Sequence, residues 1–186
     1  MADSFLNIRE LKALGLKSFG KNVRISRKAS LYAAEAISIG DHVRIDDFCI
    51  LSGNITIGSY VHISAYTALY GKGGIEIADY VTISGRVLVY SENDDYSGEF
   101  MTNPMLPDEY TNVQSEKVCF EKHAIVASGS IILPGVKMRE GSCVGAMSLL
   151  KSSTESWMIY AGVPASIIKK RKKNILVLEK KLRNQL

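Results

Sequence analysis

The chain contains one long polar segment whose side chains could bind a polar ligand. Between Tyr90 and Val118 it is rich in carboxylate, amide and phenol groups and poor in aliphatic residues. A segment of this length inside a compact domain is usually functional or disordered. The polar residues in question are Asn93, Asp94, Asp95, Tyr96, Asn103, Asp108, Tyr110 and Asn112. They could hydrogen-bond a sugar; the alternative is a solvent-exposed loop that binds no ligand.

Three histidines could move a proton, and none of them lies in that segment. Histidine has an ordinary pKa that suits a general base near neutral pH. His62 follows Val61 at a position that points outward in the repeat described below. It could therefore meet a ligand, or it could be an exposed imidazole. His123 and His42 occupy corner positions of the same repeat, where a structural or solvated role is the alternative.

Neither metal nor thiol chemistry fits the spacing of the remaining ligand types. The gaps between the histidines are 20 and 61 residues, and zinc sites use clustered His and Cys ligands instead. Cys49, Cys119 and Cys143 are far apart, odd in number and without a CxxC pair. We interpret them as small, buried or half-buried residues in a reducing cytoplasm. The sequence predicts no metal.

The framework that positions these groups is set by aliphatic or aromatic residues that recur every six positions, with a shift of two at Gly73-Gly74 and a break from Ser91 to Cys119. A period of six fits neither a helix nor a plain strand. A short strand followed by a corner explains it, because three such units, about 18 residues, close one three-sided coil. Stacked coils then bury a continuous column. The expected inward residues are Ile39, Ile45, Leu51, Ile57, Ile63, Leu69, Ile77, Ile83, Val89, Phe120, Val126, Ile132, Met138, Val144 and Leu150. We expect an all-β coil stack over residues 21–165, interrupted by an inserted loop over 90–118.

Short helical segments are expected at both ends of this domain. Residues 1–20 contain apolar residues at helical spacing, with Ser4 as a possible cap and Gly15 as a possible end. Residues 166–186 form a basic linker and a helix, which would cap the open end of the coil stack or touch a neighbouring subunit. The apolar stripe of that helix consists of Ile175, Leu178 and Leu182.

The composition narrows the range of partners. The 186 residues are 46% hydrophobic and carry a formal charge of +4, which favours a packed core and a mild basic excess. The N-terminus does not resemble a signal peptide, and no apolar stretch could cross a bilayer. The run KKRKK could be a solvated end or touch nucleic acid, but aromatic interleaving is missing. We expect neither membrane insertion nor a nucleic-acid partner.

The repeat resembles that of the hexapeptide-repeat acyltransferases, over roughly residues 20–170. Closer features are the loop SENDDYSGEFMTNPMLPDEYTN, the tract AIVASGSIILPGVKMREGSCVGAMSLL and the terminal YAGVPA. These resemble the sugar acetyltransferase branch, which includes galactoside, maltose and surface-polysaccharide O-acetyltransferases. The resemblance implies a left-handed parallel β-helix and a homotrimer in which the loop walls an acceptor pocket between subunits.

The resemblance also implies a catalytic His in the first part of the loop, which this chain lacks. Matching the helix phases places Asp94 or a neighbour there, and places His62 at the acceptor pocket. His62 and Asp94 are therefore our candidate catalytic residues. The candidate acceptor-binding residues are Ser64, Asn93, Asp95, Tyr96, Asn103 and His123.

Acetyl-CoA is the donor that the resemblance implies. Ser128 and Ala146 are 18 residues apart, so they stack one coil above the other, and the resemblance places both along the pantetheine arm. Basic residues near the end of that track would meet the phosphates. The candidate cofactor-binding residues are Ser128, Gly129, Gly145, Ala146, Lys151, Lys169, Lys170 and Arg171.

The missing loop histidine favours an amine acceptor. A sugar hydroxyl is a poor nucleophile without a base, whereas a sugar amine is partly neutral near pH 7 and needs less help. We therefore expect acetyl transfer to the amino group of a nucleotide-activated aminodeoxy sugar, in surface-polysaccharide biosynthesis (O-antigen or capsule) in the cytoplasm. The alternatives are an O-acetyltransferase acting on a saccharide hydroxyl and a noncatalytic β-helix scaffold.

Overall fold

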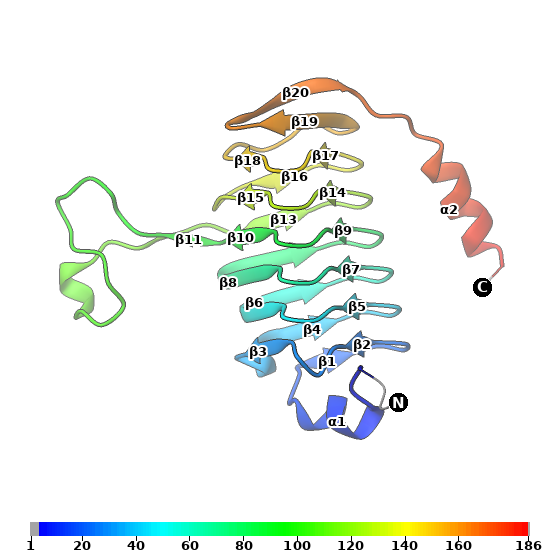
Figure 1. Cartoon of the computed structure of the whole chain (residues 1–186), viewed down its shortest axis with the longest axis horizontal. Helices are drawn as coiled ribbons and strands as arrows, with labels where there is room; N and C mark the ends of the chain where they lie inside the picture. The colour runs from blue at the N-terminus through cyan, green and yellow to red at the C-terminus, as the bar shows by residue number, and fades with distance from the viewer. Residues whose placement is uncertain (1–3, 186) are drawn as a thin grey trace.

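The chain is wound into a parallel β-solenoid of about seven turns (Figure 1). The computed structural model describes residues 4–185. One sheet, which forms one side of the solenoid, contains β2 (Arg24–Ile25), β5 (Arg44–Ile45), β7 (His62–Ile63), β9 (Thr82–Ile83), β14 (Ile125–Val126), β17 (Cys143–Val144), β19 (Met158–Gly162) and β20 (Ala165–Lys170). We call it the short-strand sheet.

The other two sides are joined into one bent sheet, because two of its strands run through a corner without interruption. Its strands are β1 (Ser18–Phe19), β3 (Ser30–Tyr32), β4 (Ile37–Ile39), β6 (Ile50–Ile57), β8 (Ala68–Ile77), β10 (Leu88–Tyr90), β13 (Val118–Phe120), β15 (Ile131–Ile132), β16 (Lys137–Met138) and β18 (Leu149–Leu150). The long strands are β6 and β8, whose register shifts after Gly53. A short 3-10 helix over Ala34–Ala36 precedes β4.

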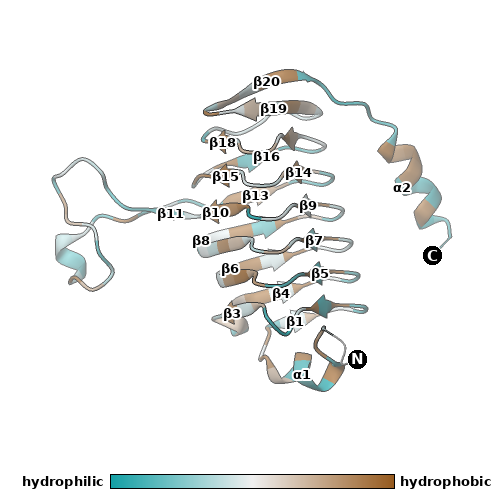
Figure 2. Cartoon of the chain, in the orientation of Figure 1, coloured by the Kyte–Doolittle hydropathy of each residue, from teal (hydrophilic) through white to brown (hydrophobic). Residues whose placement is uncertain are grey.

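Every inward residue expected from the six-residue period is buried. Strand pairing aligns these residues in columns: Ile45 pairs with Ile63, and Ile63 pairs with Ile83. Successive coils lie one strand spacing apart, about 4.8 Å, so each column is a continuous aliphatic core. The prediction of a parallel coil stack is confirmed, and Figure 2 shows the apolar residues along its strands.

Two of the three corners are built from residues with left-handed backbone angles, three positions after an inward residue. We call them corner 1 and corner 2. Corner 1 contains Asn22, His42, Tyr60, Tyr80, His123, Gly141 and Trp157, and corner 2 contains Phe48, Tyr66, Arg86, Gly129 and Met147. The backbone N–H groups of corner 1 from His42 upward, and of corner 2 from Tyr66 upward, donate to a carbonyl one coil below, as Tyr66 does to Asp47 and Tyr60 to Asp41. The third corner, corner 3, is where the long insertion leaves the solenoid.

The N-terminal helix is shorter than expected and has a different cap. Helix α1 spans Ile8–Ala13, and Asn7 caps it in a capping box with Glu10. Ser4 was the expected cap; it lies before Phe5, which forms a bridge with Ser26. Residues 18–20 already belong to the first coil, because β1 pairs with β4.

The C-terminal segment also departs from expectation. Residues 165–170 form β20, which turns back antiparallel on β19 and lies over the last coil (Figure 1). Helix α2 (Ile175–Arg183) therefore does not cap the stack but lies beside it. Glu179 holds it there, accepting hydrogen bonds from Lys122 (2.5 Å) and pairing with His123 (2.7 Å). Among residues 4–185 no helix is long and apolar enough to cross a membrane.

Candidate active site

The polar insertion leaves corner 3 through a narrow neck. Strands β11 (Glu92–Asn93) and β12 (Gln114–Ser115) pair antiparallel, and the Glu116 N–H donates to the Ser91 carbonyl (2.9 Å). Between them the chain projects away from the solenoid, on the side opposite α2, and includes a 3-10 helix over Asp108–Tyr110 (Figure 1). The neck fixes where the loop begins and ends, so residues at its base keep a fixed position on the solenoid.

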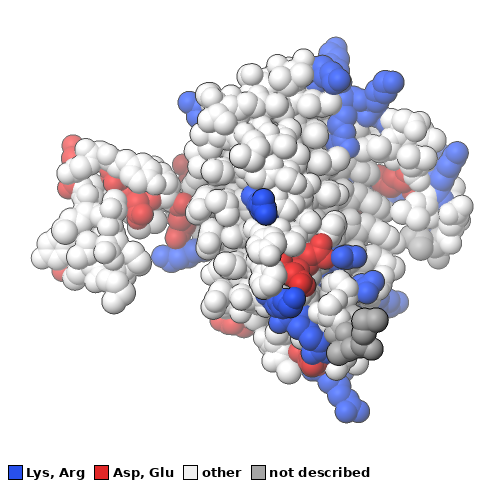
Figure 3. All heavy atoms as spheres, in the orientation of Figure 1, with Lys and Arg blue, Asp and Glu red and all other residues white. Residues whose placement is uncertain are grey.

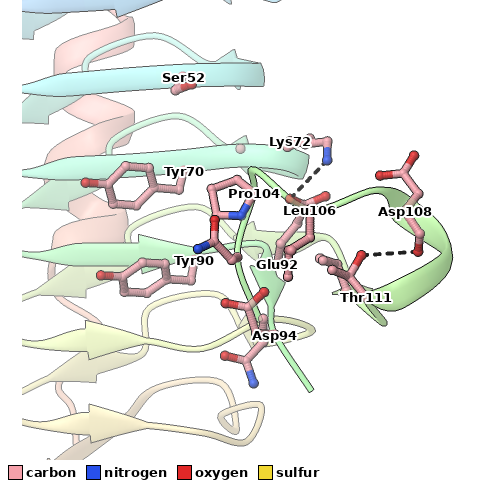
Figure 4. Close-up of a pocket in the computed structure, with 14 residues that line it drawn as sticks. Ser52, Tyr70, Lys72, Tyr90, Glu92, Asp94, Pro104, Leu106, Asp108 and Thr111 are labelled. Carbon is pink, nitrogen blue, oxygen red and sulfur yellow. Dashed lines mark hydrogen bonds and ion pairs between the residues drawn. The ribbon is translucent and has the colours of Figure 1, made fainter. Parts of the chain in front are cut away.

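A cavity of about 450 Å³ lies between this loop and corner 3. We call it the loop cavity. Its solenoid wall includes Tyr70 and Tyr90, stacked at 5.2 Å on adjacent strands, and its loop wall includes Pro104 and Leu106 (Figure 4). Burial is the main factor that raises the pKa of Tyr90, so its phenol stays neutral. The wall thus offers flat apolar surface with a few polar groups, as small-molecule sites do.

The charge of the loop cavity is negative. Glu92, Asp94 and Asp108 line it, and among residues 4–185 Lys72 is its one basic lining residue, 3.7 Å from the Glu92 carboxylate. Figure 3 shows acidic side chains gathered on the projecting loop and around its base. A cationic or amine-bearing ligand is favoured in such a cavity, and a polyanion is disfavoured.

The structure places the predicted loop residues in two groups. Asn93, Asp94 and Asn103 line the loop cavity. Tyr96 donates to the Asn93 side chain (3.1 Å), so it orients one of them. Asp95 faces the two arms of the loop instead: it accepts from the Ser97 N–H and from the Asn112 amide (2.7 Å each).

Those hydrogen bonds, led by the one from Ser97, lower the pKa of Asp95. Asp95 is therefore a brace that joins the two arms of the loop. The sequence did not single out Tyr70 and Tyr90. Each comes directly after an inward residue, Leu69 or Val89. This equivalent position in the six-residue repeat could have predicted that the two tyrosines lie side by side.

His62 lies on the outer face of β7, paired with a carboxylate that the sequence did not reveal. Its Nε2 is 2.8 Å from Asp46 Oδ2, and Arg44 Nε donates to Asp46 Oδ1 (2.7 Å). Burial alone would raise the pKa of Asp46, but the hydrogen bonds from His62 and Arg44 outweigh it and lower that pKa. Asp94 lines the loop cavity at another corner, so one chain does not bring His62 and Asp94 together.

His123 was expected near the acceptor, and the structure places it elsewhere. It is buried in corner 1, stacked on Tyr80 at 5.2 Å, and its Nε2 pairs with Glu179. Trp157 approaches from the other side, across Gly141, where a side chain would collide with the indole ring. His123 therefore anchors α2 to the solenoid. His42 is structural as expected, stacked on Tyr60 in the same corner.

The small residues expected along the donor arm lie together at corner 2. The Met147 N–H donates to the Ser128 carbonyl (2.9 Å), which places Ser128 and Ala146 one coil apart. Gly129 has a left-handed backbone, and the Met147 side chain folds over the space that its missing side chain leaves. Ser64 belongs to the strand-to-corner segment two coils below, and its carbonyl accepts from the Cys49 thiol.

The basic residues expected near the phosphates do not lie at that corner. Because β20 is antiparallel to β19, Lys169 and Lys170 pair with the start of β19, next to corner 1. Arg171 is already engaged, donating to the carbonyls of His123 (2.8 Å) and Gly141 (2.9 Å). Lys151 is exposed at corner 3, after β18.

Thiol chemistry has little support in these surroundings. Cys49 is buried, and desolvation raises its pKa to about 11. Desolvation also raises the pKa of Cys119 and Cys143. A neutral thiol is a weak nucleophile and metal ligand. Within residues 4–185 no group of three His, Cys, Asp or Glu side chains is arranged to hold a metal ion.

Comparison with known proteins shows the family. The chain is 48% identical over 179 residues to the dTDP-4-amino-4,6-dideoxy-D-glucose acyltransferase of Escherichia coli, covering 95% of this chain and 93% of that one. This chain belongs to the hexapeptide-repeat acyltransferases. Residues 36–71 match the family model for the bacterial transferase hexapeptide (six repeats).

Solved structures resemble this acyltransferase over its whole length. AntD, an N-acyltransferase from Bacillus cereus, was solved with dTDP and 3-hydroxybutyryl-CoA; it is 52% identical, with a TM-score of 0.96 and 98% of each chain covered. A substituted AntD was solved with dTDP-4-amino-4,6-dideoxyglucose and coenzyme A; it is 51% identical, with a TM-score of 0.97 and 100% of each chain covered. The acyltransferase described here therefore has the fold of enzymes that bind both a nucleotide sugar and coenzyme A.

Proposed function

We propose that this acyltransferase moves the acetyl group of acetyl-CoA to the amino group of a dTDP-linked 4-amino-4,6-dideoxy sugar. The observation that carries the proposal is an acidic cavity with tyrosine walls in a chain of the same family, length and fold as enzymes with such acceptors. Carboxylates draw in an amine, whereas a neutral hydroxyl acceptor would not need three of them.

Asp94 is the proposed proton acceptor for the amine. The neutral amine nitrogen attacks the thioester carbonyl, forming a C–N bond and a tetrahedral oxyanion. The oxyanion collapses, the C–S bond breaks, and coenzyme A leaves as its thiol after taking up a proton. The proton lost by nitrogen passes to a carboxylate, and Asp94 lies in the cavity for this role. Transfer by such a base typically contributes about 10²–10⁴-fold in rate.

His62 is the second proposed group for proton transfer. The Asp46 carboxylate fixes the His62 ring, and Arg44 holds that carboxylate in turn. In this role His62 would shuttle the proton onward, while Asp94 stays next to the amine. Asn93 and Asn103 would orient the sugar, with Tyr96 holding Asn93 in place.

Corner 2 is the proposed track for the donor. Ser128, Gly129, Gly145 and Ala146 have small side chains, so backbone amides along this edge can pair with the pantetheine arm and stabilise the oxyanion once the exposed Met147 side chain, which folds over Gly129, moves aside. Lys151 lies at corner 3 and Lys169 and Lys170 lie next to corner 1, so none of them reaches the phosphates of a donor bound along corner 2 of the same chain.

We propose further that the active enzyme is a homotrimer. The projecting loop carries exposed apolar side chains, Tyr96 and Met105 among them, and corner 2 exposes Phe48, Tyr66 and Met147. A neighbouring chain would bury both sets, and would bring a loop cavity next to a corner 2. The biological setting that fits such a product is surface-polysaccharide biosynthesis in the cytoplasm.

The test is a transfer assay with purified protein. Acetyl-CoA and 3-hydroxybutyryl-CoA are each offered with dTDP-4-amino-4,6-dideoxyglucose, and products are identified by mass and by resistance to mild base. A base-stable product gaining one acetyl group is the expected result. Turnover of 3-hydroxybutyryl-CoA alone would correct the donor. A base-labile product, formed equally from a sugar without the amine, would contradict the proposed acceptor.

A further inference from the structure

The C-terminal segment carries a charge that the rest of the chain does not share. Residues 169–186 contain eight Lys or Arg residues and one Glu, a formal charge of +7, whereas the whole chain carries +4. The other 168 residues are therefore acidic as a group, at −3. Figure 3 shows basic side chains gathered over the last coil and the linker that leads from β20 to α2. The proposed function leaves this concentration of charge without a role.

Most of these cations have no partner in the chain. Arg171 donates to backbone carbonyls, Arg183 pairs with Glu179, and Lys173 Nζ lies 5.4 Å from the Trp157 ring centroid. The other five, all exposed, are Lys169, Lys170, Lys172, Lys180 and Lys181. None of these five forms an ion pair with any residue from 4 to 185. Unneutralised cations gathered at one end of a protein attract an extended anionic surface.

Exposed aliphatic side chains lie among these cations. In helix α2, Val177 and Leu178 are 53% and 54% exposed, and in β20 Ile168 is 58% exposed. Leu176 and Leu182 are also exposed. The outer face of a helix on a globular protein is normally polar or charged. A helix that combines exposed Leu and Val with lysines is instead typical of proteins that lie on a membrane surface.

Helix α2 is held so that this apolar and basic surface faces away from the solenoid. Glu179 lies on its inner side, where it meets Lys122 and His123. At 3.6 residues per turn, residues two positions away from Glu179, Val177 and Lys181, lie on the opposite side of the helix. The polar loop projects from the other side of the solenoid (Figure 1). A surface that contacts α2 therefore leaves the loop cavity open.

We propose that β20, the linker and α2, residues 165–183, form a docking surface for an anionic lipid membrane. We call it the C-terminal surface. Its lysines meet the headgroups, while Ile168, Val177 and Leu178 enter the boundary between headgroups and acyl chains. The helix lies on the membrane and does not cross it. This inference goes beyond the proposed function and does not depend on it.

The exposed aliphatic residues favour lipid over nucleic acid. Proteins that bind nucleic acid combine cations with aromatic rings that stack on bases, or with polar side chains that contact base edges. Residues 165–186 contain no aromatic residue. Exposed Ile, Val and Leu gain nothing from a phosphate backbone, whereas a bilayer removes them from water. A second copy of the chain is the other alternative, and the experiment separates it from lipid.

The test is co-sedimentation of the full chain with vesicles of phosphatidylglycerol and phosphatidylcholine, compared with vesicles of phosphatidylcholine alone. The partition coefficient is expected to be at least about tenfold higher on the anionic vesicles. It should fall at high salt, because surface charges are then screened. Equal partition on the two kinds of vesicle, or no binding to either, would overturn the proposal.

The charge variant combines Lys180→Gln with Lys181→Gln. It should weaken partition at least about tenfold, because each lysine near an anionic leaflet contributes about fivefold. The matched control combines Lys12→Gln with Lys17→Gln, which removes the same charge from exposed residues at the opposite end of the solenoid. This control should stay within about twofold of the parent. Equal losses in the two variants would overturn the proposal, because total charge and not this surface would then determine binding.

The apolar variant combines Val177→Gln with Leu178→Gln and leaves the charge unchanged. It should weaken partition at least about fivefold. The urea midpoint should not change, because both side chains are exposed and Gln is a good helix former. Unchanged partition would overturn the proposal, and binding of a DNA duplex by the parent would then assign the surface to nucleic acid. A smaller assembly of this variant in light scattering without vesicles would also overturn it, because a second copy would then cover α2.

Acetyl transfer measured without vesicles keeps the two proposals apart. All three variants should retain the kcat of the parent, since their side chains lie outside the loop cavity and corner 2. A protein that binds anionic vesicles but transfers no acetyl group has the C-terminal surface without the proposed function. A protein that transfers the acetyl group but does not distinguish the vesicles has the proposed function without this surface.

Discussion

The loop cavity and a second cavity, at the lower coils of corner 2, are nearly equal in volume and differ in their lining. About 450 Å³ beside the loop carries three carboxylates and one lysine, whereas about 410 Å³ at corner 2 is lined by the rings of Phe5, Phe48 and Tyr66, by Arg44 and by the carboxylates of Asp46 and Asp47. The loop cavity depends on a long insertion, whereas the cavity at corner 2 depends mainly on residues that repeat with the coils.

The largest effect is expected from the acidic side of this comparison. Asp94→Asn should lower kcat about 100-fold or more, because the amine loses its proton acceptor, and should leave the dissociation constant of dTDP within twofold. Steady-state kinetics and calorimetry on the same preparation measure both. Glu99→Gln removes a loop carboxylate that does not line the cavity, and should keep full activity. If kcat of Asp94→Asn stayed within fivefold of the parent value, the loop cavity would have no catalytic role.

The proposed proton relay is tested at His62. His62→Asn should lower kcat about tenfold, because the imidazole would no longer pass the proton of the amine onward. Turnover within threefold of the parent in His62→Asn would remove this residue from the mechanism.

The smallest effect is on stability, and it differs between the two regions. The pKa of Asp46 is lowered in the folded chain, so its ion pairs stabilise the fold above the ordinary carboxyl pKa and fade as pH falls through the lower folded value. Asp46→Asn should therefore cost about 1 kcal/mol in urea unfolding at pH 7, and little near pH 3. Asp95→Asn breaks bonds within the loop alone and should leave the solenoid's urea midpoint unchanged. A pH-independent cost for Asp46→Asn would contradict this assignment.

The coil stack was predictable because one inward residue in six is enough to define its core. Ile45, Ile63 and Ile83 need only be aliphatic and correctly spaced, and both properties can be read directly from the sequence. The corner ladders were equally periodic, at the third position after each inward residue, yet side-chain types there vary from Phe48 to Arg86 to Gly129. The corner positions recur at a fixed spacing but do not share one type of side chain, so an analysis of hydrophobic periodicity does not detect them.

The site was predictable only in part, because partners come from distant coils. The sequence identified Asp94, but the carboxylate next to His62 was Asp46, 16 residues earlier and one coil below. His123 fits a ligand-binding role by composition alone; its actual partner, Glu179, is 56 residues away in a helix expected at another place. Lys169 and Lys170 lie in β20, away from the proposed donor track. The sequence did not predict this position, because nothing in the basic run indicates an antiparallel turn.

The neck of the loop has a consequence for how such enzymes diversify. The chain leaves and re-enters at one corner, and the coils on either side pair as though nothing had been inserted: β10 stacks on β15 and β8 on β13. Residues 95–113 can therefore be lengthened, shortened or exchanged without changing the packing of the core. A new acceptor preference could arise by replacing that segment alone.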